Sequence, residues 1–82
     1  SSMPVILRAK GYEFSFVMFD LDEPVHVHVR SGRKQAKFWV DPPFIAWSHG
    51  FRPSELNEIR RIIVANQEYI FSVWQREDAK RR

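Results

Sequence analysis

The chain has 82 residues, of which 44% are hydrophobic and 15% aromatic, so we expect one small folded domain with a thin core. Thirteen Lys and Arg against ten Asp and Glu give a net charge of +3, which permits contact with nucleic acid or an acidic protein and demands neither. The absence of cysteine excludes a disulfide framework and a thiolate zinc site. We therefore expect a shallow groove or surface patch as the functional site, and no cofactor.

The ends of the chain and its apolar runs bear on its location. No apolar run approaches the roughly 20 residues that a membrane-spanning helix needs, and the N-terminus lacks a signal-peptide pattern. Ser1 and Ser2 precede Met3 and are interpreted as the remnant of an expression tag, which leaves residues 3–82 as a single domain. Together with the lack of cysteine, these features predict a cytoplasmic protein.

The first part of the chain is typical of a β-hairpin. Residues 5–9 form a short apolar run, and Lys10 with Gly11 marks a turn. Residues 12–19 then alternate, with aromatic side chains on one face, as expected for a half-buried strand. An acidic loop is predicted over residues 20–24.

Two further strands are predicted in the middle of the chain. Residues 25–30 alternate cleanly, and a basic turn at residues 31–34 connects them to a strand over residues 36–40. The sequence Asp-Pro-Pro at residues 41–43 ends that strand, because proline cannot donate to a ladder. Residues 44–51 are ambiguous between a strand and a helical turn, and a strand or extended connector is favoured.

The C-terminal part of the chain has the periodicity of an amphipathic helix. Pro53 suits a first helical position and Glu55 falls in the first turn. Helix is predicted from Pro53 to about Ala79, with a break left open near residues 65–66. Its apolar stripe consists of Leu56, Ile59, Ile63, Ile70, Val73 and Trp74. The expected class is α+β: a small antiparallel sheet of three to five strands packed by C-terminal helix.

The stretch EPVHVHVR at residues 23–30 is the candidate functional motif. The three valines are predicted to face the core, while His26, His28 and Arg30 face outward. Lys37 and Trp39 of the next strand share the outward face. Arg33 and Lys34 lie in the intervening turn and are candidates for additional contacts with a partner or a phosphate.

Three functions are open for this motif. Two histidines at i and i+2 could converge on a metal ion, but a third ligand is needed and no spacing dictates it; the candidates are Asp20, Asp22, Glu23 and His49. His26 and His28 could act as acid and base in a small ribonuclease, with Arg30 and Lys37 stabilising charge on phosphate. The same face could instead bind a partner protein or nucleic acid, with Trp39 as a stacking or interface residue.

The motifs together resemble a bacterial family known as domain of unknown function 4160. The matching segments are residues 3–7, 11–12, 23–29, 36–42, 50–51 and 55–59, with Asn66 and Trp74 further along the helix. The resemblance implies a short bacterial or phage-borne product, encoded beside a small protein that resembles domain of unknown function 2442, in an arrangement like a toxin–antitoxin pair.

The chain departs from the family's pattern at two positions. Val25 replaces a usual proline before the first histidine, which alters the entry to the histidine strand. Arg52 stands where the family often has serine, so we expect the helix to lose its side-chain cap and its capping box with Glu55.

The preferred expectation is therefore a toxin–antitoxin-type accessory protein. It would bind the small protein encoded by the neighbouring gene, and nucleic acid as a further option, through the strand face of His26, His28, Arg30, Lys37 and Trp39. The ribonuclease is the alternative and a histidine-based metal-binding protein the third hypothesis. Self-association of the chain is also left open.

Overall fold

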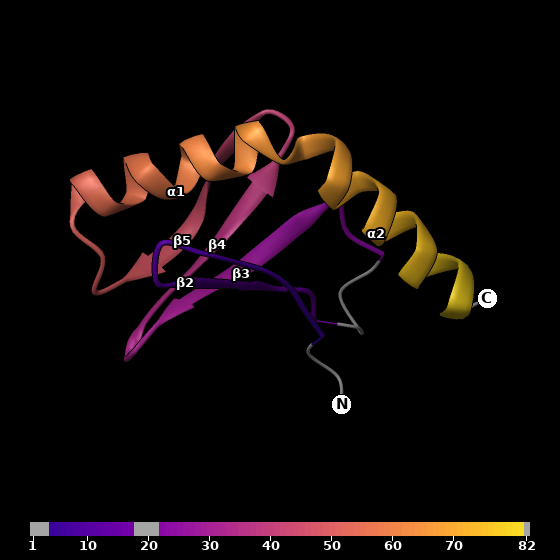
Figure 1. Ribbon diagram of the computed structural model, residues 1–82, viewed down its shortest axis with the longest axis horizontal. Helices are drawn as coiled ribbons and strands as arrows, with labels where there is room; N and C mark the ends of the chain where they lie inside the picture. The colour runs from indigo at the N-terminus through magenta and orange to yellow at the C-terminus, as the bar shows by residue number, and fades with distance from the viewer. Residues whose placement is uncertain (1–3, 18–21, 82) are drawn as a thin grey trace.

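The computed structural model describes residues 4–17 and 22–81. Its five strands are β1 (Val5–Ala9), β2 (Tyr12–Ser15), β3 (His26–Ser31), β4 (Lys34–Val40) and β5 (Pro43–His49), and its helices are α1 (Pro53–Ala65) and α2 (Gln67–Arg81). The strands form one antiparallel sheet in the order β1-β2-β3-β4-β5. Helix α1 lies across one face of the sheet, and α2 bends away from α1 and descends past one end of it (Figure 1). The predicted α+β class is confirmed.

The sheet is a meander, in which two-residue turns join β1 to β2, β3 to β4 and β4 to β5, and residues 16–25 connect β2 to β3. Lys10 and Gly11 both have positive φ, as a two-residue type I′ hairpin requires, and they join β1 to β2. Gly32, with a φ of 61°, supplies the same freedom in the turn between β3 and β4. The predicted turns at both places are confirmed.

Most of the ambiguous segment, residues 44–49 of 44–51, lies in the edge strand β5, which begins at Pro43. It pairs with β4, and the register shifts so that Phe38 opposes Ile45 while Lys37 opposes Trp47. Ala46 is therefore an extra residue, a β-bulge, on the edge strand. The favoured interpretation of this segment as a strand is confirmed.

The core lies between the sheet and the two helices. The alternating residues of β2 and β3 that were predicted to face inward are buried, including Phe14, Val27 and Val29. The predicted helical stripe meets them with five buried side chains: Ile59, Ile63, Ile70, Val73 and Trp74. Burial of this apolar surface is the main favourable term that holds the layers together.

The predicted break in the helical segment occurs at Asn66. Its side-chain amide donates to the carbonyl of Ile62 at 2.8 Å, and its own carbonyl accepts from the amide of Ile70 at 2.9 Å. Asn66 thus ends α1 and supplies the first acceptor of α2. The bend lets α2 turn over the end of the sheet (Figure 1). None of the described helices is long and apolar enough to cross a membrane.

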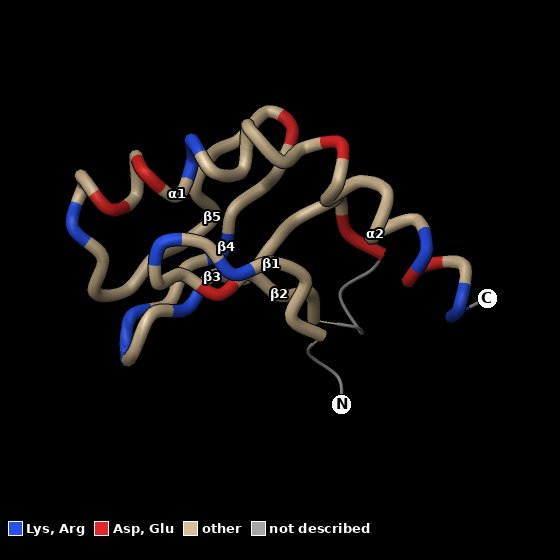
Figure 2. The backbone as a smooth tube through the Cα atoms, viewed as in Figure 1, with Lys and Arg blue, Asp and Glu red and all other residues tan. Residues whose placement is uncertain are grey.

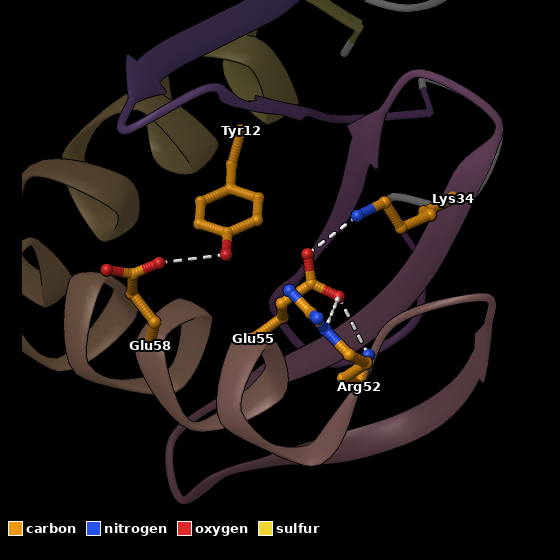
Figure 3. A network of polar contacts seen from close by, with 5 residues as sticks. All are labelled: Tyr12, Lys34, Arg52, Glu55 and Glu58. Atoms are coloured by element: carbon orange, nitrogen blue, oxygen red, sulfur yellow. Dashed lines mark hydrogen bonds and ion pairs between the residues drawn. The ribbon is translucent and has the colours of Figure 1, made fainter.

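The start of α1 corrects one expectation. Arg52 gives no side-chain cap, since its guanidinium has only donors. However, Glu55 still accepts from the backbone amide of Arg52 at 2.8 Å, so the expected loss of the capping box was wrong for its Glu55 half. Lys34 Nζ lies 2.6 Å from the same carboxylate and ties α1 to β4 (Figure 3).

A second polar contact ties α1 to β2. The hydroxyl of Tyr12 donates to Glu58 Oε1 at 2.8 Å (Figure 3). Burial of the phenol and, after it, the hydrogen bond to Glu58 raise the pKa of Tyr12 to about 12. The tyrosine therefore remains a neutral donor throughout the physiological pH range.

We expect the Glu55 carboxylate to make the stability of α1 sensitive to acid. The backbone amide of Arg52, and then Lys34, hold the pKa of Glu55 below its ordinary value of 4.5. Its contribution is complete above pH 4.5 and is lost as the pH falls through the lowered pKa. Glu55→Gln keeps an acceptor for the cap but no charge, so urea unfolding below pH 4.5 should show a shallower loss of stability than in the unmodified protein.

A second variant separates the two causes. Lys34→Met removes the Lys34 contact, the smaller of the two causes that lower the pKa of Glu55. Its loss of stability in acid should therefore be intermediate between those of the unmodified protein and Glu55→Gln. Parallel acid limbs for all three proteins would contradict the assignment of this acid sensitivity to Glu55.

Candidate functional site: the open face of the sheet

The sheet face opposite α1 carries the histidine motif, and we call it the open face. The pairing register of the strands determines which residues lie on the open face, because directly paired residues point to the same side of a sheet. The open face comprises Val5, Arg8, Glu13, Ser15, His26, His28, Arg30, Gln35, Lys37, Trp39, Phe44, Trp47 and His49. Five of the seven predicted site residues are therefore brought together, as the alternation predicted.

His26 is the main correction to the predicted site. It lies on the predicted strand face, but its exposed fraction is 0%, so the expectation of an outward-facing side chain was wrong. The ring of Trp74, from α2, lies 5.2 Å from the imidazole, and that of Trp39 lies 5.7 Å from it. Because α2 bends over the end of the sheet, Trp74 covers the first residue of β3. Nδ1 of His26 lies 2.9 Å from the carbonyl of Pro24, so it carries the proton and donates it.

His28 is the more accessible of the two histidines. It is half-buried, and its ring lies 5.4 Å from that of His26 and 6.0 Å from that of Trp47. Lys37 is its direct partner on β4. His28 therefore occupies the middle of the open face, between an aromatic residue on the edge strand and the covered histidine.

Each cation at the centre of the open face has a carboxylate partner. Lys37 Nζ lies 2.6 Å from Glu23 Oε1 and 4.7 Å from the centre of the Trp39 ring. The hydrogen bond from Lys37 is the main cause that lowers the pKa of Glu23. Arg30 and Arg8 share Glu13, at 3.0 and 3.3 Å. The central surface therefore pairs its cations with carboxylates, with one arginine in excess, and it positions its long side chains through ion pairs and a cation–π contact.

Arg33 and Lys34 do not join the open face. Lys34 is the first residue of β4, and its ammonium group turns to Glu55 on the helical side of the sheet. Arg33 is exposed at the tip of the β3–β4 turn. Of the two residues, Arg33 is the more exposed, and Lys34 is engaged with Glu55.

Two aromatic residues of the open face were not identified from the sequence. Phe44 and Trp47 are three residues apart, which conflicts with the period of two expected for one face of a strand. The bulge at Ala46 restores both to the open face. The sequence signal for these residues is the pair of aromatic side chains just after two prolines. It does not show which face they share, because a bulge cannot be placed from spacing alone.

The open face is hollowed over its central strands. A groove of about 410 Å³ lies there, lined by Val5, Glu13, Ser15, His28, Val29, Arg30, Gln35, Ala36 and Trp47. Its walls combine ion-paired, polar and aromatic groups. This matches the expectation of a shallow groove rather than an enclosed cavity.

The metal hypothesis has no geometric support in the described part of the chain. Within residues 4–17 and 22–81, no three His, Asp or Glu side chains come together as a metal site would require. Asp20, one of the candidate ligands, lies outside the described residues.

The fold and the face define a class: a small α+β protein with helices on one side of a meander sheet and a grooved, aromatic surface on the other. A family model described as a domain of unknown function (DUF4160) matches residues 11–75, which is well over half of the chain. The chain belongs to this family, and the resemblance carried by its histidine and helix motifs is confirmed. Neither a curated protein nor a solved structure matches it.

Proposed function

We propose that the protein is a binding module that holds a small partner protein on its open face, as the accessory member of a toxin–antitoxin-type pair. The observation that carries the proposal is the groove of about 410 Å³ beside the exposed ring of Trp47 and between ion pairs. Tryptophan and arginine are enriched at the centres of protein interfaces, where their neighbours exclude water. The partner expected from the family resemblance is the product of the neighbouring gene.

The charge arrangement favours a protein over a nucleic acid. Affinity for nucleic acid comes largely from lysines and arginines that neutralise phosphates. On the open face, Glu23 is paired with Lys37, and Glu13 is shared between Arg30 and Arg8. A phosphate backbone would have to displace these carboxylates from their cations, and its own negative charge would then be repelled by them. A polypeptide that offers both signs of charge meets no such repulsion.

The ribonuclease alternative draws less support from the geometry. An acid and a base must both reach the reacting phosphate. His26 is covered by Trp74 and has no exposed surface, whereas His28 faces the groove. Incubation with total RNA tests this alternative directly: cleavage that is lost in His26→Ala and in His28→Ala would favour it over the binding module.

The binding proposal predicts a face-specific loss of affinity. We expect the purified protein to bind the neighbouring gene's product in isothermal titration calorimetry, and Arg30→Glu to weaken binding about tenfold, because it sets a second carboxylate directly opposite Glu13 at one end of the groove. Arg60→Glu is the matched control, since Arg60 is an exposed arginine of α1. Equal affinities for both variants, or no binding by the unmodified protein, would refute the proposal.

A further inference from the structure

The two edges of the sheet differ in how they are protected. Unpaired backbone groups at a sheet edge invite another strand, and natural edges are shortened, bulged, charged or covered. At the β1 edge the strand has five residues, a register shift between Val5 and Leu7, and a charge at Arg8. The hydroxyl of Tyr69 also donates to the carbonyl of Ile6 at 2.5 Å. The β1 edge is therefore closed to strand addition.

The β5 edge is also bulged, at Ala46, and begins at Pro43, but it is longer than β1 and carries no charge. The strand has seven residues without Asp, Glu, Lys or Arg, and Figure 2 shows it free of charged residues. Phe44, Ile45 and Trp47 are 52%, 40% and 38% exposed. Among the backbone hydrogen bonds of the described residues, those of β5 run to β4. A long, uncharged, apolar edge of this kind would be an aggregation site unless a strand covers it.

We propose that β5 pairs in antiparallel fashion with β5 of a second copy of the chain. A two-fold axis would then join two five-stranded sheets into one continuous sheet. The occupant must be a strand, because only a strand satisfies the row of outward backbone groups along β5. The pairing leaves His28, Arg30 and Lys37 of the open face uncovered and sets Trp47 at the junction of the two copies; it goes beyond the proposed function and does not depend on it.

Charge at the ends of β5 sets the orientation. Asp41 precedes the strand, and Arg52 follows it by three residues. Antiparallel pairing brings the acidic end of one copy beside the basic end of the other, and it does so at both ends of the interface. Parallel pairing would place like charges together. Because the strand between them is uncharged, no repulsion opposes contact between two copies.

The bulge sets the register. Cross-strand neighbours must point to the same side of a sheet, and Phe44 and Trp47 both lie on the open face. Setting Phe44 opposite Trp47 of the second copy satisfies this condition, and the two-fold axis repeats the pair. Each exposed ring would then be covered by the other, in the arrangement that aromatic cross-strand pairs favour.

Sedimentation equilibrium over about a hundredfold range of protein concentration tests the pairing. We expect a concentration-dependent dimer, weakened at least about tenfold in Ile45→Lys, because each copy then brings a desolvated lysine to the contact. Val5→Lys is the matched control, since Val5 is a similarly exposed apolar residue of the other edge, and it should dimerise normally. Circular dichroism verifies that both variants fold, and Ala46→Lys replaces Ile45→Lys if that variant does not. A monomer throughout, or equal effects of the variants at the two edges, would overturn the proposal.

Cross-linking tests the register independently. The chain has no cysteine, so Phe44→Cys and Trp47→Cys each introduce a unique thiol. Under oxidising conditions the mixed variants should form a disulfide-linked heterodimer, because directly opposed residues have Cα atoms within disulfide range. Each variant alone should form little, and intact mass identifies the product. Homodimers in yields equal to the heterodimer, or no covalent dimer in the mixture, would overturn the register.

Discussion

Replacing Trp74 by alanine is expected to lower the free energy of unfolding by about 3–5 kcal/mol, the range for loss of a large buried aromatic side chain. Trp74 is buried at the end of the sheet, where its ring meets the edge of Phe16 at 5.0 Å and of His26 at 5.2 Å. Denaturant unfolding followed by far-ultraviolet circular dichroism measures the change. The same substitution should open His26 to solvent, which NMR detects as faster exchange of its Nδ1 proton with water.

Trp47→Ala is the matched control for this substitution. It removes the same side chain from an exposed position on the edge strand, so its cost should stay within about 1 kcal/mol. Equal costs for the two tryptophans would contradict the packing of α2 over the end of the sheet. Unchanged exchange of the His26 Nδ1 proton in Trp74→Ala would contradict the role of Trp74 as its cover.

Ile63→Ala is expected to cost about 2–5 kcal/mol, because it leaves a cavity between α1 and the sheet. Ile63 is 0% exposed, whereas the adjacent Val64 is 47% exposed. Val64→Ala therefore serves as a control one residue away, and its cost should lie near zero, since alanine is the better helix former. Urea midpoints of the two variants measure the difference. A cost for Val64→Ala as large as that for Ile63→Ala would show that α1 is rotated relative to the packing described above.

The elements of the fold follow from local patterns in the sequence. Alternation placed the three valines of residues 25–29 in the core and both histidines on the other face, since the period of a strand is a geometric property of its backbone. The helical stripe and the break at Asn66 were equally local. Each of these predictions needed only the residues of one element and its turns.

The environment of the site was harder to predict because it depends on contacts between distant elements. The burial of His26 results from the bend between α1 and α2, which brings Trp74 to a residue 48 positions earlier in the chain. The pairing of Lys37 with Glu23 similarly joins a strand to a loop. No periodicity encodes the bend angle or these contacts, so the sequence predicted the open face but not which of its residues stay accessible.

The meander order of the sheet has a consequence for how the chain folds. Every strand pairs with its neighbour in sequence, so the sheet forms through short loop closures, which favours rapid folding. The long-range contacts are those of the helices, such as Tyr69 with Ile6 and Arg81 with Asp22. The hairpins that carry His26 and His28 can therefore assemble before α2 docks, and covering His26 belongs to the final, long-range stage of folding.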